Sequence, residues 1–215
     1  MDVHAVYDFF LRPFRRRRML AFARTFRLDR GTTVLDVGGT RYNWALLDSA
    51  PRVTLLNLES PHAGTGLPGN VAAVVGTGTQ LAFADAAFDV AFSNSVIEHV
   101  GGPEAREAFA RELRRVGRGV WVQTPARSFF VEPHLLAPFL HWLPVGWQRR
   151  LIRWVSLWGW ISRPTPERVE RFLAQTHLLD AAELRALFPD CELRRERFLG
   201  LTKSYVAVRL PVALR

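Results

Sequence analysis

The stretch "VLDVGGTRYN", Val34 to Asn43, has the pattern of a buried strand that ends in a glycine loop. The apolar run Thr33 to Val37 predicts the strand, and ligands bind beyond the C-terminal ends of strands in open parallel sheets. Gly38–Gly39 is therefore expected where the backbone approaches a ligand closely. The dinucleotide fingerprint G-x-G-x-x-G is incomplete, because Thr40 and Asn43 occupy its later glycine positions. The loop alone is also compatible with a plain strand-to-helix turn.

A smaller anion than a pyrophosphate suits this loop better. The helix expected from about Tyr42 to Leu47 offers free N–H groups to an anion, and a carboxylate needs fewer of them than a pyrophosphate. Asp36, just before the glycines, is suited to attract an ammonium group. Carboxylate and ammonium together form the methionyl end of S-adenosylmethionine (SAM).

Length and composition limit the classes of protein to which the chain can belong. The 215 residues are enough for one well-buried core, and 48% hydrophobic and 23% charged residues are ordinary globular values. We expect no membrane span, because there is no apolar run of 18 residues, and no secretory signal at the N-terminus. The single Cys191 excludes an internal disulfide and a multi-cysteine zinc site. We therefore expect a cytoplasmic protein.

The net charge of +9 comes almost wholly from arginine, since Lys203 is the only lysine. The arginines cluster at 15–18, 111–118, 149–153 and 194–197. Such clusters indicate an anionic partner, namely nucleic acid, a membrane surface or a phosphorylated substrate, or else merely solvated helix faces.

Alternating strands and helices predict a parallel sheet with crossover helices. Apolar runs at 33–37, 53–58, 71–75, 88–93 and 118–123 are typical of strands buried on both faces. The clearest helix is 103–116, which starts with a proline after two glycines. A helix at 180–188 precedes two strands, 191–198 and 203–210, which we expect to pair antiparallel at the sheet edge.

Two further segments belong to the same single domain, 1–215. Residues 1–30 are expected to form a helical cap, with one or two helices over 2–28 that are broken or kinked near Pro13. Residues 126–165 hold five of the seven tryptophans and are too long for an ordinary connection, so we interpret them as an insertion or lid.

The chain resembles the class I SAM-dependent methyltransferases, particularly the type 11 group, from about Val34 to Pro125. The resemblance is carried by "VLDVG" and by "VVGTGTQLAFADAAFDVAFSNSVIEHV", Val74 to Val100, although Thr40 and Tyr42 replace two glycines of the first motif. It implies a Rossmann-like α/β fold: a seven-stranded, mostly parallel sheet with helices on both faces and an antiparallel edge strand.

The resemblance also implies roles for individual residues. Asp36, Gly38 and Gly39 would hold the methionyl end. Asn57 stands at the usual ribose acid, and Glu59, two residues on, could supply the missing carboxylate or be a surface residue. Thr77 and Gly78 would lie at the adenine. Ser93 and Asn94 would line the methyl-transfer site, with Glu98 and His99 at its edge.

The histidines are the candidate bases. His99 is the first candidate for a general base and His134 the alternative, although a packing histidine would also suit position 99. The six histidines, at 4, 62, 99, 134, 141 and 177, show no paired metal-ligand spacing, so no metal is expected.

The favoured function is transfer of a methyl group from SAM to a small-molecule or lipid-like acceptor. A nucleotide-dependent oxidoreductase is disfavoured by the missing glycines and the absence of a Tyr-x-x-x-Lys pair. A nucleic-acid substrate is disfavoured because "SNSVIEH" stands where base-modifying methyltransferases carry an Asn/Asp-Pro-Pro-Tyr run. A non-catalytic methyltransferase-like protein that binds a partner or a membrane through the insertion is the remaining alternative.

The segment "GWQRRLIRWVSLWGW", Gly146 to Trp160, predicts an amphipathic helix. At 100° per residue, one face carries Trp147, Leu151, Trp154, Val155 and Trp158, with arginines opposite or at its margins. Two interpretations stay open. The helix is a lid that packs its tryptophans onto the substrate pocket, or residues 138–160 contact the inner face of an anionic membrane.

Overall fold

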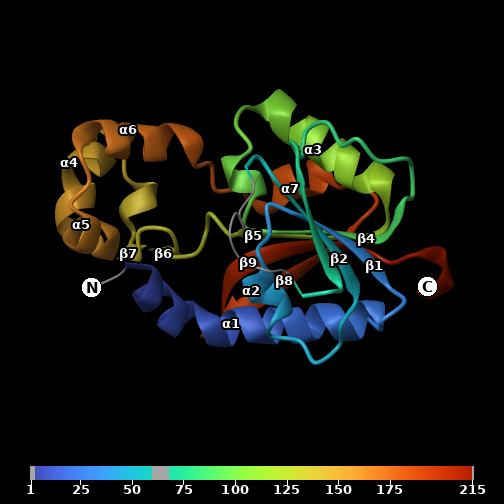
Figure 1. Ribbon diagram of the computed structural model, residues 1–215. Coiled ribbons are helices and arrows are strands. Elements are labelled where there is room, and N and C mark those ends of the chain that lie inside the picture. The colour runs from blue at the N-terminus through green and yellow to red at the C-terminus, as the bar shows by residue number, and fades with distance from the viewer. Residues whose placement is uncertain (1–2, 60–67, 215) are drawn as a thin grey trace.

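The computed structural model describes residues 3–59 and 68–214, with side chains from residue 12 onward. Its centre is a seven-stranded sheet with the strand order β3-β2-β1-β4-β5-β9-β8 (Figure 1). The strands are β1 (Thr33–Val37), β2 (Arg52–Asn57), β3 (Val71–Val75), β4 (Phe88–Asn94), β5 (Gly117–Pro125), β8 (Glu192–Phe198) and β9 (Leu201–Arg209). Two short strands, β6 (Val131–Glu132) and β7 (Ala137–Pro138), pair separately.

The strand directions confirm the predicted fold. Strands β1 to β5 are parallel, and β9 runs antiparallel between β5 and β8. The predicted pairing of the last two strands is thus confirmed, and β1 lies in the middle of the sheet between β2 and β4. The glycine loop after β1 therefore opens at the point where the strand order reverses, which is where parallel sheets bind ligands.

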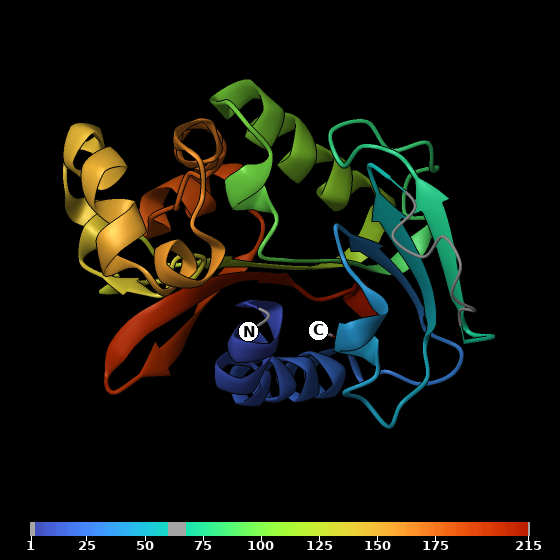
Figure 2. The ribbon, with the colours of Figure 1, turned by 60° about the vertical axis from the view of Figure 1, so that its left-hand side comes forward.

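Helices cover both faces of the sheet (Figures 1 and 2). On one face, α1 (Val3–Phe26) and the short α2 (Arg41–Trp44) pack onto the aromatic side chains of the sheet. On the other face, α3 (Pro103–Val116) and α7 (Ala181–Leu187) bury Phe109, Leu113 and Leu184 against the same strands. Because the inner strands are covered twice, they need the continuous apolar runs that the sequence shows.

Helix α1 is one helix of 24 residues that continues through Pro13. Its Phe22 is fully buried, with ring centroids 4.7 Å from Phe92 and 5.4 Å from Trp121. The segment expected as an N-terminal cap is therefore a complete layer of the fold. Residues 1 and 2 of that segment lie outside the described part of the chain.

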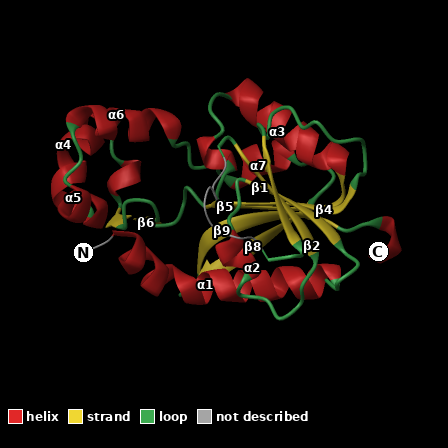
Figure 3. Cartoon of the chain, in the orientation of Figure 1, coloured by secondary structure: helices red, strands yellow, loops and turns green. Residues whose placement is uncertain are grey.

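The insertion forms a lobe beyond the end of β5 (Figures 1 and 3). It contains β6, β7, a 3-10 helix η2 (Leu140–Trp142), and the helices α4 (Val145–Val155), α5 (Leu157–Ser162) and α6 (Pro166–Gln175). The lobe has its own small core of Leu135, Ala137, Leu140, Ile152, Trp158 and Val169. It extends to the end of α6, ten residues beyond the predicted boundary at 165.

The prediction of one helix over 146–160 is wrong. The chain is extended at Ser156 (φ −110°, ψ 146°), whose hydroxyl accepts a hydrogen bond from the Gly159 amide at 2.9 Å and caps α5. The turn brings α5 so close to α4 that a Cβ on Gly159 would lie 2.4 Å from the carbonyl oxygen of Ile152. Trp158 consequently packs inward against Phe172, whereas Trp154 is 72% exposed. The predicted tryptophan face is divided between two helices.

The aromatic packing of α1 is open to a direct test. Phe22→Ala should lower the free energy of unfolding by about 3–5 kcal/mol, because it leaves a cavity among fully buried rings. Urea unfolding followed by far-UV circular dichroism measures the loss. Arg17→Ala on the exposed side of the same helix should change stability by no more than about 0.5 kcal/mol. Equal losses in both variants would contradict the assignment of α1 to the core.

Candidate active site

The two glycines after β1 are held in a tight space between neighbouring strands. Gly38 has φ +77°, and a Cβ there would lie 2.5 Å from a Val96 methyl carbon. A Cβ on Gly39 would lie 1.8 Å from the Asp36 carboxylate. The Gly38 amide donates to the carbonyl oxygen of Leu56 at 2.8 Å. The backbone can follow this path only with glycine at both positions, so the loop is a close approach and more than a plain turn.

Asp36 lies beneath this loop and is fully buried. Its Oδ2 accepts a hydrogen bond from the Trp44 indole at 2.8 Å, and its Oδ1 is buried without a hydrogen-bond partner. Burial raises the pKa of this carboxyl to about 7, although the Trp44 bond opposes the shift. The side chain lines neither of the cavities described below, so the loop separates it from them. Its predicted contact with an ammonium group remains a prediction.

A first cavity of about 710 Å³ brings together most of the predicted cofactor residues. Its lining includes Gly38, Asn57, Glu59, Thr77 and Gly78. The Asn57 side-chain amide donates to the carbonyl oxygen of Gly39 at 3.0 Å and so supports the glycine loop. A Cβ on Gly78 would lie 2.6 Å from the ring of Phe109. The predicted ribose and adenine positions therefore share one cavity beside β1 and β2.

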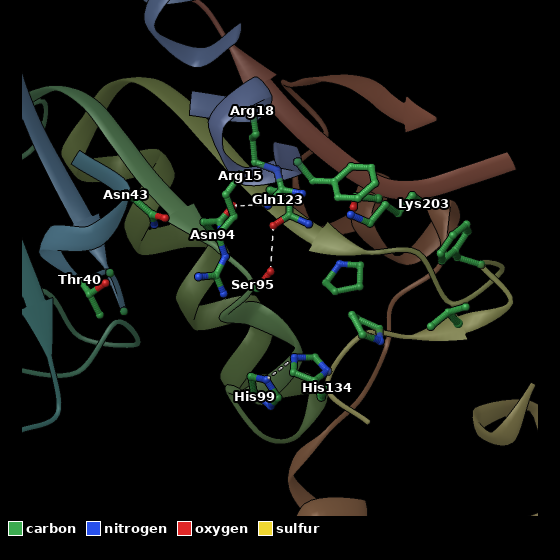
Figure 4. Close-up of a pocket in the computed structure, with 18 of the residues that line it drawn as sticks. Arg15, Arg18, Thr40, Asn43, Asn94, Ser95, His99, Gln123, His134 and Lys203 are labelled. Carbon is green, nitrogen blue, oxygen red and sulfur yellow. Dashed lines mark hydrogen bonds between the residues drawn. The ribbon is translucent and has the colours of Figure 1, made fainter. Parts of the chain in front are cut away.

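A second cavity of about 340 Å³ lies on the other side of the glycine loop (Figure 4). It is lined by Gly38, Gly39, Asn94 and His99, all predicted site residues. Ser93 is not among them, because it is fully buried and donates to the carbonyl oxygen of Val37 at 3.0 Å. Gly38 and His99 line both cavities, which therefore adjoin at these two residues.

Ser95 also lines the second cavity, although it was not among the site residues predicted from the sequence. It follows β4 with φ +56°, a left-handed conformation that is uncommon for serine. Its backbone amide and its hydroxyl both donate to Gln123, at 3.0 Å to the carbonyl oxygen and 2.9 Å to the side-chain oxygen. The β4 and β5 ends are thereby fixed together at the mouth of the second cavity.

Positive side chains gather on the opposite wall of the second cavity, and none of the described residues that line it is an aspartate or glutamate. The three cations are Arg15 and Arg18 from α1 and Lys203 from β9. Arg18 is nearly buried, and it donates to both carboxylate oxygens of Glu196 and, at 2.7 Å, to Asn94. Burial, together with the nearby Arg18, lowers the pKa of Lys203 to about 8. The wall therefore favours an anionic group.

The third feature is a cluster of two histidines and two glutamates at the rim of the second cavity. Glu98 and His99 come from the 3-10 helix η1 (Ile97–His99) after β4, and His134 follows β6. The two imidazole rings face each other, with their Nε2 atoms 3.1 Å apart (Figure 4). The His134 Nδ1 lies 2.6 Å from the carboxylate of Glu132, which is buried.

Glu98 is also buried in this cluster. Its Oε2 accepts a hydrogen bond from Thr124 at 3.0 Å, and its Oε1 lies 3.8 Å from the His134 Nε2. Burial raises the pKa of Glu98 and lowers the pKa of His99 to about 4. Burial also disfavours a charged His134, but the neighbouring Glu132 carboxylate outweighs this effect and raises its pKa. The sequence marked Glu98, His99 and His134 but not Glu132. The side chains of His4 and His62 lie outside the described part of the chain.

Comparison with known proteins matches one part of the chain to a family. Residues 35–119 match the sequence model of the family Methyltransf_11, described as a methyltransferase domain. A search of curated proteins found no match. The chain therefore carries a SAM-dependent methyltransferase domain, and SAM is the cofactor of that family.

Solved structures show the same fold. One is a 1,6-didemethyltoxoflavin-N1-methyltransferase from Burkholderia thailandensis with S-adenosylhomocysteine bound, at 17% identity, TM-score 0.56, and coverage of 95% of this chain and 81% of that one. A SAM-dependent methyltransferase from Methanosarcina mazei matches at 16% identity and TM-score 0.51, covering 84% and 92%. The [4+2]-cyclase SpnF matches at 15% identity and TM-score 0.53, covering 92% and 81%. The fold is thus common to proteins with different reactions.

The buried Asp36 predicts a characteristic pH dependence of stability. Its folded-state pKa of about 7 lies above the ordinary 3.8, so between these values the carboxyl ionises in the unfolded chain but stays neutral in the folded one, which favours unfolding. The free energy of unfolding of cofactor-free protein should fall between about pH 4 and pH 7, by roughly 2–4 kcal/mol from this group. Asp36→Asn should flatten the curve in that window, because the amide cannot ionise and still accepts from Trp44.

Urea titrations of the wild type and Asp36→Asn at pH 5 and pH 8 measure this difference. Glu104→Gln, at an exposed position on α3, is the control and should keep the wild-type pH dependence. The same pH dependence in the wild type and Asp36→Asn would contradict the buried, protonated carboxyl.

Proposed function

We propose that this SAM-dependent methyltransferase domain transfers a methyl group from SAM, held in the first cavity, to a small-molecule or lipid-like acceptor in the second. The single observation that carries this proposal is that the two cavities adjoin at Gly38 and His99. A cofactor on one side of the glycine loop and an acceptor on the other can meet there. Transfer mainly requires that the two reactants are aligned, which can lower a barrier by roughly 7–11 kcal/mol.

The residues of the first cavity have the chemistry that the nucleoside end of SAM requires. Glu59 offers a carboxylate to the ribose hydroxyls, and Asn57 supports the loop through Gly39. Thr77 offers only a hydroxyl at the adenine, and that hydroxyl already bonds Thr79 at 2.9 Å. We therefore assign the ribose contact to Glu59. The adenine would be recognised by the shape of the cavity wall around Gly78.

The methionyl end belongs at the glycine loop, where its carboxylate and the sulfonium enter the second cavity. When bound, SAM supplies an activated methyl group on a positively charged sulfur. The amides after Gly39 and the cation Arg15 are positioned for the carboxylate, and Asn94 lines the route to the acceptor. Ser93 lies behind this surface and does not reach the cavity, because its hydroxyl donates to the carbonyl oxygen of Val37.

His99 is the candidate to accept a proton from an acceptor hydroxyl or amine. Its imidazole lines both cavities, so a nucleophile that points at the methyl group also lies near this ring. His134 contacts it and is oriented by Glu132. A general base contributes about 10²–10⁴ in rate when the acceptor must lose a proton, and the lowered pKa of His99, about 4, places it at the lower end of that range.

A second proposal concerns the surface of the insertion, which we assign to peripheral contact with an anionic membrane on its inner face. Large exposed apolar side chains gather within 138–160: Phe139, Trp142, Leu143, Val145, Trp147, Trp154, Val155 and Trp160. Arg150 and Arg153 lie on the same helix, α4, and are exposed. Tryptophan beside arginine suits the headgroup region of a bilayer. None of the described helices is long and apolar enough to cross a membrane, so the contact would be on its surface.

The lid interpretation draws support from other side chains of the lobe. Val131, Pro133, His134 and Leu136 line the second cavity, so the insertion does form part of its wall. The tryptophans of α4 are not among the lining residues, and Trp158 packs in the lobe's own core. The lobe can therefore enclose an acceptor on one side and present its tryptophans to a lipid surface on another.

Cofactor binding tests the first proposal. Isothermal titration with SAM and S-adenosylhomocysteine should give saturable binding by the wild type and none by Gly38→Val, because the new side chain collides with Val96. Glu59→Ala should weaken binding by about 1–3 kcal/mol through the lost ribose contact. Asp36→Ala should abolish binding as well, since it removes the carboxylate that we expect to attract the ammonium group of SAM.

Glu107→Ala, on the exposed side of α3, is the control and should bind like the wild type. Normal binding by Glu59→Ala with loss in Asn57→Ala would move the ribose contact to Asn57. No SAM binding by folded wild type would favour the non-catalytic alternative.

Liposome co-sedimentation tests the surface proposal. Binding should require anionic lipid, decrease with added salt, and be lost in the double variant Trp147→Ala/Trp154→Ala, whose side chains are 57% and 72% exposed. The matched control is Trp44→Phe, because Trp44 is buried beneath the glycine loop and cannot reach a lipid. Equal sedimentation of the double variant and the wild type, or no binding at all, would leave only the lid interpretation.

A further inference from the structure

We propose that Glu98, His99 and His134 bind a divalent transition-metal ion at the rim of the second cavity. One possible ligand atom from each of these three side chains lies within 4.8 Å of the other two. Two imidazoles and one carboxylate are a ligand set found in catalytic zinc sites and in non-haem iron sites. The expectation of no metal rested on sequence spacing, which does not register ligands 35 residues apart.

The partners of the two Nδ1 atoms bear on which nitrogen of each imidazole carries its proton. The His134 Nδ1 lies 2.6 Å from the Glu132 carboxylate, which accepts hydrogen bonds, so this nitrogen carries a proton. The His99 Nδ1 lies 3.4 Å from the carbonyl oxygen of Gln175, which only accepts, and 3.4 Å from the hydroxyl of Thr176, which can donate or accept. When His99 carries its proton on Nδ1, bonded to Gln175, both Nε2 atoms direct lone pairs at each other across 3.1 Å, and this is the tautomer that binds a metal ion.

Glu98 adds a third electron-pair donor to the same point. Its Oε1 is buried without a hydrogen-bond partner, 3.8 Å from the His134 Nε2. A buried carboxylate oxygen in this condition is costly unless a positive centre stands beside it. That centre is either an extra proton on a ring or a metal ion that all three atoms share.

The distances suit a metal ion. With Zn–N bonds of about 2.0–2.1 Å, two nitrogens of a tetrahedral site are separated by about 3.3 Å, close to the observed 3.1 Å between the rings. Glu98 would need to move only slightly toward the rings from its present 3.8 Å. The second shell is already in place, since Glu132 holds His134 and Thr124 holds Glu98 at 3.0 Å.

The site would leave coordination positions open toward the acceptor. Both histidines line the second cavity, so an ion between them faces the space that we assign to the acceptor. An ion there polarises an acceptor hydroxyl directly, and His99 then serves as a ligand instead of a base. Only this consequence rests on the proposed function, because metal binding itself requires neither SAM nor an acceptor.

The experiment uses full-length protein purified without a histidine tag and treated with a chelator. Equilibrium dialysis against Zn²⁺, and titration with Co²⁺ followed by its visible absorption, should both show one tight site per chain. His99→Ala and His134→Ala should each weaken binding by at least about 100-fold, and Glu132→Gln by about 10–100-fold through loss of the ring's orientation.

His141→Ala and His177→Ala are the matched controls, because they remove histidines that lie outside the cluster. Both should bind metal like the wild type. Thermal unfolding confirms that each variant is folded, and Zn²⁺ should raise the melting temperature of the wild type but not of His134→Ala. Glu98→Gln adds a variant that keeps the size of the buried side chain.

Absence of a tight site in the wild type, or equal binding by His134→Ala and the controls, would overturn the inference. These outcomes are distinct from failure of the proposed function, which calorimetry with SAM measures on the chelator-treated protein. A protein that binds SAM and transfers methyl groups after complete metal removal would retain the function and leave His99 as the base.

Discussion

The architecture of the site depends on the confinement of Gly38 and Gly39. A side chain on Gly38 would collide with Val96, and a side chain on Gly39 would collide with the Asp36 carboxylate. The constraint comes from three adjacent strands, since Asp36 lies in β1, Leu56 lies in β2, and Val96 follows β4. Because the loop is pinned on both sides, it forms a thin wall of bare backbone between two cavities. A cofactor and an acceptor can approach each other only where a wall is that thin.

The fold was predictable because its inner strands are buried on both faces. The edge strand β3 is the exception: its run 71–75 was expected to be buried, but Val74 and Val75 are exposed. Within the run 88–93, residues 90–92 are apolar at successive positions and buried, so even a one-residue error in the limits of the strand does not change the assignment. The glycine loop and the residues of the first cavity were predictable for a related reason. Asn57 ends β2 and Thr77 follows β3, and parallel strands bring their ends to the same edge of the sheet, while the order of the inner strands came from the family resemblance.

The second cavity was harder to predict because its wall is assembled from distant segments. Arg15, Gln123 and Lys203 come from α1, β5 and β9, and nothing in their local sequence links them. Ser93 shows a second limit of local reasoning. It lies at the right strand end, but successive side chains of a strand point to opposite sides, and a bond to Val37 directs it away from the cavity.

The prediction of one helix over 146–160 failed because hydrophobic periodicity does not show what a helix packs against. Trp154 and Trp158 share a face at 100° per residue, and only the break at Ser156 separates them into exposed and buried residues. The sequence does carry a signal for the break. Serine as an N-cap followed three positions later by a glycine is compatible with a helix start, and the closeness of Gly159 to Ile152 requires that glycine.

The same lobe supplies half of the histidine cluster, so its attachment to the sheet governs the chemistry at the rim. His134 belongs to the lobe, whereas Glu98 and His99 belong to the sheet domain. The two parts meet at the end of α6, where the His177 amide donates to the carbonyl oxygen of Glu98 at 2.8 Å and Gln175 lies beside the His99 ring. A displacement of the lobe by a few tenths of an ångström would change the 3.1 Å separation of the rings. Any contact that fixes the lobe, whether an enclosed acceptor or a lipid surface, therefore also sets the geometry of the cluster beside the methyl-transfer site.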